Sequence, residues 1–121
     1  MVDKLELGFH EAMLDIYHRA KRETGYNATY FLQMVNSRGG LDAAKHLVAT
    51  HTPSDGYTKL WELGRLDISV EALIHDNPKW HGLFTRQELK RVRDRLDAYG
   101  YFGSGGSDHS VPMSDPRDLL H

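Results

Sequence analysis

Residues 60–74, LWELGRLDISVEALI, decide the fold of this chain. Their apolar residues fall into two groups at helical spacing, separated by Gly64 and Asp67. Glycine commonly supplies the left-handed residue that ends a helix, and Asp67 or Ser69 can cap the helix that follows. Two short helices that meet at a tight corner, each with an apolar face, are typical of the middle of a small helical core.

The segments on either side of this corner repeat the helical pattern. Apolar residues recur at steps of three and four over residues 3–24, which predicts one long first helix. Asn27 is expected to cap the second helix, which is apolar enough to be buried on most sides. Thr85 and Glu88 have the spacing of a capping box at the start of the last helix. The six expected helices span residues 3–24, 28–37, 41–50, 54–64, 69–76 and 85–100.

No stretch alternates apolar and polar residues with the period of a strand. We therefore predict an all-α fold, a compact bundle of about six short-to-medium helices. The composition changes after Phe102, where residues 103–110 read GSGGSDHS, a sequence typical of flexible linkers. The predicted organisation is a single helical domain over residues 1–102 and a Gly/Ser-rich flexible tail over residues 103–121.

The composition excludes several classes of protein. The 121-residue chain has no cysteine, which excludes a disulfide framework, thiol catalysis and a zinc site built on thiolates. Its start, MVDKLEL, lacks the basic residues and apolar run of a signal peptide. No apolar run approaches the ~20 residues of a membrane span. We expect a soluble cytoplasmic protein.

The net charge of −2 is unevenly distributed along the chain. Residues 42–76 carry three Lys/Arg and six Asp/Glu, whereas residues 79–95 carry six and two. Such an asymmetry can steer a charged partner, although ordinary solvated faces also produce it.

The first helix carries a second group of residues outside its inner stripe. Leu7 and Leu14 are seven residues apart, with histidine and lysine around them. Two interpretations are open: scattered exposed residues, which are common, or a contact face for a partner protein or a second copy. The partner-binding candidates are Leu7, His10, Leu14, His18 and Lys21.

The last helix and the segment before it are basic, which raises nucleic-acid binding as an alternative. Arg86, Lys90 and Arg93 follow one flank of the helix. The competing interpretation is that these cations complement the negative end of the helix and pair with its own carboxylates. The nucleic-acid-binding candidates are Lys79, Arg86, Lys90, Arg91, Arg93 and Arg95.

The fourth and fifth helices also mimic a helix-turn-helix motif. A recognition helix must present polar or basic side chains to the groove of DNA. Here Glu71 and Asp76 are expected among the exposed residues, and carboxylates that face phosphates repel them. We therefore reject the helix-turn-helix interpretation on charge.

Eight histidines raise the question of a metal site. Two ligands on one helix face need a spacing of three or four residues. The pairs Asp42/His46 and Asp15/His18 fit, but each supplies only two ligands. We predict no metal site and no cofactor.

Glu62, Asp67 and Glu71 are close in sequence to the central corner. Two carboxylates held together can share a proton and do acid–base work. More often such residues cap helices or face water. We predict no catalytic residue, and an enzyme with a site between helices stays open as a further alternative.

Four segments carry a resemblance to a known family: residues 25–34 (GYNATYFLQM), 39–45 (GGLDAAK), 64–73 (GRLDISVEAL) and 83–85 (LFT). Over roughly residues 10–101 the chain resembles a family of small all-helical bacterial domains of uncharacterised function. The resemblance implies a bacterial, cytoplasmic origin and transfers no functional residue.

These observations favour a non-enzymatic small cytoplasmic protein that acts through protein–protein interaction in a regulatory or accessory role. Its expected partner is another protein or a second copy of itself, with no membrane involved. Three features carry this hypothesis: the absence of a convergent catalytic set, the apolar second face of the first helix, and the separated tail over residues 103–121. Nucleic-acid binding through the basic last helix is the alternative, and an enzyme is the further alternative.

Overall fold

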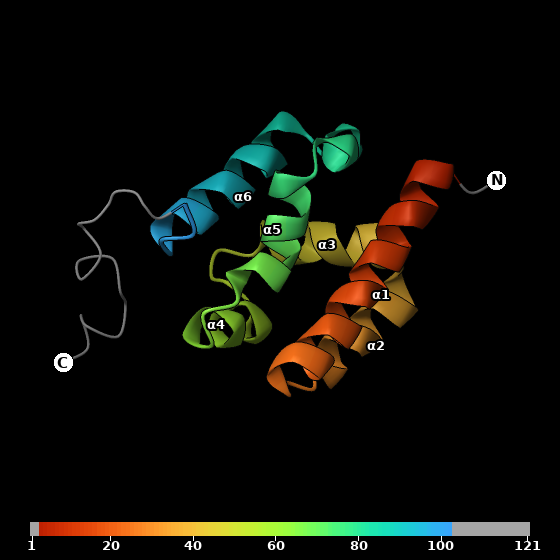
Figure 1. Cartoon of the computed structure of the whole chain (residues 1–121). Coiled ribbons are helices and arrows are strands. Elements are labelled where there is room, and N and C mark those ends of the chain that lie inside the picture. Colours follow the sequence, from red (N-terminus) through yellow and green to blue (C-terminus); the bar gives the residue numbers. More distant parts are fainter. Residues whose placement is uncertain (1–2, 103–121) are drawn as a thin grey trace.

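The computed structural model of the protein describes residues 3–102 (Figure 1). Over this range the chain forms six α-helices and two 3₁₀ helices and no strand, which confirms the prediction of an all-α bundle. The predicted flexible tail, residues 103–121, lies outside the described residues. The elements are α1 (Lys4–Thr24), α2 (Thr29–Arg38), α3 (Gly40–Ala49), α4 (Asp55–Glu62), η1 (Leu66–Ile68), α5 (Val70–Asp76), η2 (Pro78–Leu83) and α6 (Arg86–Ala98).

The long helix α1 packs against α2 and α3. It ends at Gly25, whose φ of 80° is the left-handed conformation expected at the end of a helix. Gly40 lies so close to α1 that a Cβ atom there would come within 2.6 Å of the Cα of His10. The absence of a side chain at Gly40 therefore lets α3 cross α1 as Figure 1 shows. The buried stripe of α1 consists of Phe9, Met13, Ile16 and Ala20.

The central corner forms as the sequence predicts. Gly64 follows α4 with a φ of 73°, and η1 leads into α5. Of the two candidate caps, Ser69 is the one used, since its Oγ accepts the Ala72 N–H at 3.1 Å. Asp67 instead faces Arg65, with a shortest N–O distance of 2.9 Å.

The start of α6 also follows the local sequence. Thr85 and Glu88 form the capping box, each side chain accepting the other residue's backbone N–H. Just before it, η2 places Trp80 in the core, where its ring centroid lies 5.5 Å from that of Phe9. α6 then packs against α5 and α3. None of the helices within residues 3–102 combines the length and apolar character that crossing a membrane requires.

Two predictions about α2 are wrong. Ala28, not Asn27, is the N-cap residue, and Asn27 Oδ1 accepts the Tyr17 hydroxyl at 2.7 Å instead. Only Val35 of this helix is buried, and Tyr30 is 78% exposed. The physical reason is that α2 packs against α1 and α3, so its remaining face is left open.

Candidate binding groove

A groove of about 490 Å³ lies between the α1–α2 pair and α4. Figure 1 shows these elements on opposite sides of the lower part of the molecule. The volume is within the ~300–1,000 Å³ range that is typical of ligand sites. Residues of α3, the α3–α4 loop and α5 complete the lining. We call this feature the α2–α4 groove. Its main apolar residues are Ile16, Ala20, Phe31, Met34, Tyr57 and Leu60.

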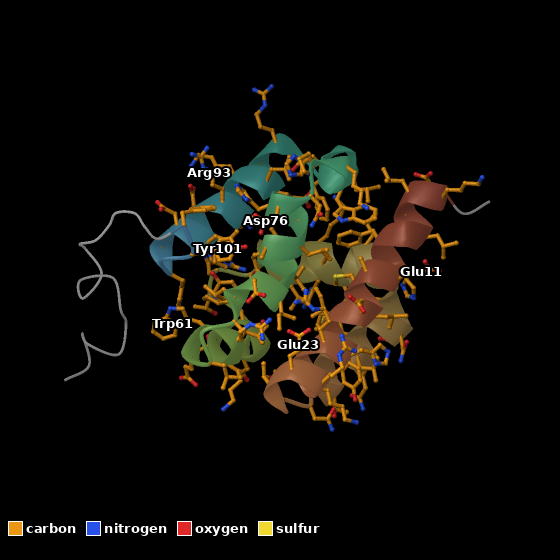
Figure 2. All side chains as sticks on the ribbon, viewed as in Figure 1. Glu11, Glu23, Trp61, Asp76, Arg93 and Tyr101 are labelled. Carbon is orange, nitrogen blue, oxygen red and sulfur yellow. The ribbon has the colours of Figure 1, made fainter. Side chains whose placement is uncertain are left out.

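The groove exists because α4 is held to α6 rather than to α2. The Tyr57 hydroxyl donates to the backbone oxygen of Arg95 at 3.2 Å. The Trp61 indole N–H donates to the backbone oxygen of Tyr99, also at 3.2 Å. Figure 2 shows Trp61 on the side of α4 that faces the end of α6. These two bonds fix α4 against α6, while Tyr57 and Leu60 of the same helix border the groove.

Below the apolar lining, Glu71 and Arg95 form a buried ion pair. Arg95 Nη1 lies 2.8 Å from Glu71 Oε2, and only 9% of Arg95 and 3% of Glu71 are exposed. The same guanidinium donates to the backbone oxygens of Leu47 at 3.3 Å and Thr50 at 2.6 Å. Arg95 therefore neutralises a carboxylate on α5 and satisfies carbonyl groups at the end of α3.

Burial raises the pKa of Glu71, and the neighbouring Arg95 opposes that rise. Burial likewise raises the pKa of the Tyr57 hydroxyl. Both groups line the groove, and both are engaged with α6. Removing either interaction would leave a buried polar group without its hydrogen-bond partner. The two interactions therefore hold α4 and α5 to α6.

The rim of the groove is polar and acidic. Asp55, Thr52 and His46 are exposed there. Among the described residues that line the groove, the charged side chains are Asp55 and Glu71, and none is Lys or Arg. Since Arg95 neutralises Glu71, the unbalanced charge at the groove is that of Asp55.

The five partner-binding candidates on α1 do not form one open face. Leu7 is 48% exposed, and His18 and Lys21 are also exposed. Leu14, however, is partly buried and packs against the core. His10 Nδ1 accepts the Gly40 N–H at 2.8 Å. None of the five lines the α2–α4 groove.

Some of the six nucleic-acid-binding candidates bind other residues of the domain, and others are exposed. Arg95 is one of the nucleic-acid-binding candidates, which requires an exposed side chain, but its guanidinium points inward to Glu71 and only 9% of the residue is exposed. Arg91 donates to the backbone oxygen of Ala49 at 3.0 Å.

Two other cations of this region, Lys90 and Lys79, have neighbours at the surface. Lys90 pairs with Asp94 at 2.7 Å, and Lys79 Nζ lies 4.8 Å from the centre of the Trp80 ring. Arg86 and Arg93 are exposed, and Figure 2 shows Arg93 pointing away from the core. The three residues of the predicted flank, Arg86, Lys90 and Arg93, are all exposed, and Lys90 pairs with Asp94 of the same helix.

The helix-turn-helix interpretation fails for a different reason from the one predicted. Glu71 was expected to be exposed, but it is buried, together with Val70, Ala72 and Ile74. Helix α5 therefore has little surface to present to a nucleic acid.

The three carboxylates near the central corner have different surroundings. Asp67 faces Arg65, Glu71 faces Arg95, and Glu62 is exposed.

A surface ion network holds the end of α1 to the corner. Arg65 Nη2 lies 2.6 Å from Glu23 Oε1, while its Nε lies 2.9 Å from Asp67 Oδ1. Hydrogen bonds from Arg19 and Arg65 lower the pKa of Glu23 to about 2. Figure 2 places Glu23 between α1 and the corner. The network therefore joins segments that are about 40 residues apart in the chain.

Sequence reasoning missed both the groove and the buried pair. One signal for the pair was available, because Arg95 lies three residues after Val92 and so on the inner side of α6. No corresponding signal existed for the groove, since its walls come from helices that are distant in sequence.

Over residues 3–102, no group of three or more His, Asp or Glu side chains is placed to hold a metal ion. Comparisons of the chain with models of protein families, with characterised proteins and with solved structures find no match.

Proposed function

We propose that this chain is a non-enzymatic cytoplasmic protein that binds a segment of another protein in the α2–α4 groove. The observation that carries the proposal is the groove itself, about 490 Å³ in volume, with apolar residues of all five helices from α1 to α5 in its lining. Tyr30, 78% exposed, stands among its lining residues. Exposed aromatic residues beside an apolar depression are common anchors in protein interfaces.

The two buried titratable groups of the lining are engaged within the fold, whereas His46 and Asp55 are exposed at the rim. A general acid or base needs a titratable group that can reach the substrate. The buried carboxylate of Glu71 is engaged by Arg95, and the hydroxyl of Tyr57 is engaged by a carbonyl of α6. Both groups therefore serve the packing of helices around the groove.

The groove supports the proposal better than the α1 face. Two members of that face, Leu14 and His10, already have structural contacts with the rest of the domain. Leu7 alone remains as a large exposed apolar residue there. A single exposed leucine is common on protein surfaces and needs no partner to explain it.

Selection of peptides from a displayed random library, with the full-length chain as bait, tests this proposal. We expect selected peptides to lose at least about tenfold in affinity for Tyr30→Ala, in line with the loss of an interface anchor. Leu7→Ala is the matched control, because it also removes an exposed apolar side chain from a helix. Neither change should alter the circular dichroism spectrum.

Two results would contradict the proposal. A library that yields no specific binder would remove the evidence for peptide recognition. Binders that depend on Leu7 and ignore Tyr30 would place the interface on α1 instead.

A further inference from the structure

We infer that the occupant of the α2–α4 groove is an amphipathic helix of a partner protein, with three apolar anchors and a Lys or Arg that faces Asp55. This inference rests on the proposed function and specifies its partner. It follows from three properties of the groove: the helices that form its walls, its volume and its charge.

One wall of the groove is formed by side chains of α2 that are only partly buried. Phe31 and Met34 are three residues apart on this helix, whereas Ile16 and Ala20 of α1, at 8% and 1% exposed, lie deeper in the core. Residues at a spacing of three form a ridge against which another helix packs. A groove bordered by such a ridge suits the binding mode in which an amphipathic helix inserts its apolar face.

The volume of the groove limits the number of apolar side chains that a partner can insert. An apolar cavity of ~150 Å³ accommodates one benzene-sized group. The groove volume of about 490 Å³ is roughly three times as large. It therefore has room for about three apolar side chains, the number that an amphipathic helix presents over two turns at positions i, i+4 and i+7.

The charge selects a basic helix. Asp55 is exposed at the rim, and the described lining contains no Lys or Arg that would balance it. The chain's own residues 103–121 carry three Asp against one Arg, so their charge matches that of the rim rather than complementing it. Opposite charge beside an apolar contact favours one partner over others because like charges repel.

Three synthetic peptides of about 14 residues, or four helical turns, provide the test. All carry leucine at i, i+4 and i+7. The first has lysine beside the leucines, the second has glutamate there, and the third is the lysine peptide with a central proline. Proline breaks a helix, so the third peptide separates helical from extended binding. Affinity for the full-length chain is measured by fluorescence anisotropy at low salt.

We expect the lysine peptide to bind about tenfold more tightly than the glutamate peptide, and the proline peptide to bind at least about tenfold more weakly. Asp55→Asn should reduce the preference for lysine to about threefold or less, since it removes the exposed carboxylate of the described lining. Glu62→Gln is the matched control, because it removes the same charge from an exposed residue of α4 outside the groove. It should leave the preference unchanged.

Several outcomes would overturn the inference. Equal binding of the proline peptide would exclude a helical occupant, and equal or tighter binding of the glutamate peptide would exclude the basic one. If no peptide binds at ~1 mM, neither the helical nor the basic character of the occupant is supported, and the inference is wrong. If library peptides still bind in a manner that depends on Tyr30, the groove remains a binding site and only its occupant is wrong.

Two further results would assign the groove to another occupant and would likewise overturn the inference. Tighter peptide binding by the full-length variant with Leu119→Ser and Leu120→Ser would indicate that the chain's own end competes for the groove. A dimer that Tyr30→Glu dissociates in sedimentation experiments would indicate a second copy.

Discussion

Replacement of Arg95 by methionine should destabilise the protein far more than the same change at any exposed arginine. The change keeps much of the side-chain volume but leaves the Glu71 carboxylate buried and without its counter-ion, which lies 2.8 Å away in the native protein. Breaking a buried pair on one side costs about 3–5 kcal/mol. The backbone oxygens of Leu47 and Thr50 lose their donor as well. We therefore expect a loss of at least about 3 kcal/mol in the free energy of unfolding.

The loss should depend on pH, and its sign follows from Glu71. Burial raises the pKa of this carboxyl above its ordinary value of 4.5, and Arg95 opposes the rise. In the Arg95→Met variant the lowering effects of Arg95 are lost, and burial, the largest cause, raises the pKa of Glu71 further. The folded state then holds a proton more readily than the unfolded chain. The variant should therefore regain stability as the pH falls from about 8 toward about 5, because protonation removes the buried charge.

Urea denaturation followed by circular dichroism at several pH values measures this effect. Arg93→Met is the control, since Arg93 is exposed on the same helix and its loss should cost less than about 0.5 kcal/mol. The double variant Glu71→Gln with Arg95→Met should recover part of the loss at neutral pH. Equal effects of Arg95→Met and Arg93→Met, or a loss that does not change with pH, would refute the reasoning.

Two further changes probe the close helix contact and the surface ion network. Gly40→Ala should lower the free energy of unfolding by about 1–3 kcal/mol, as overpacking does, because its Cβ would lie 2.6 Å from the Cα of His10. Gly82→Ala is the control, since a Cβ at Gly82 would have no atom within 4 Å. Similar urea midpoints for the two variants would contradict the close approach of α3 to α1. Glu23, with a pKa of about 2, stabilises the fold above pH 4.5 and loses this effect as the pH falls toward about 2. Arg65→Ala should therefore differ most from the native protein above pH 4.5, and a difference that stays constant down to about pH 2 would argue against the network.

The two charged clusters have different roles in the domain. The exposed network around Arg65 ties the corner to α1 and is screened by water and salt. The buried pair of Arg95 and Glu71 lies beneath the groove and joins three helices. Because this pair ties α3, α5 and α6 together, we expect the part of the groove that Glu71 lines to change little on binding, which would reduce the entropy lost.

The sequence by itself determined the helices and most of their ends. Gly25 and Gly64 adopt the positive φ expected after a helix, and Thr85 with Glu88 forms the expected capping box. These features depend on residues within about four positions of one another, so the chemistry that produces them is visible locally. The repeat of apolar residues likewise predicted the inner stripe of α1.

Only the tertiary structure decided which residues are exposed and where a binding site lies. Arg95 pairs with Glu71, which lies 24 positions earlier in the chain. Tyr30 remains exposed because, within residues 3–102, α2 packs mainly against α1 and α3. The walls of the groove come from residues as distant as Ile16 and Leu60. Burial depends on contacts between elements far apart in sequence, and helical spacing predicts which side of a helix is apolar without predicting which neighbour covers it.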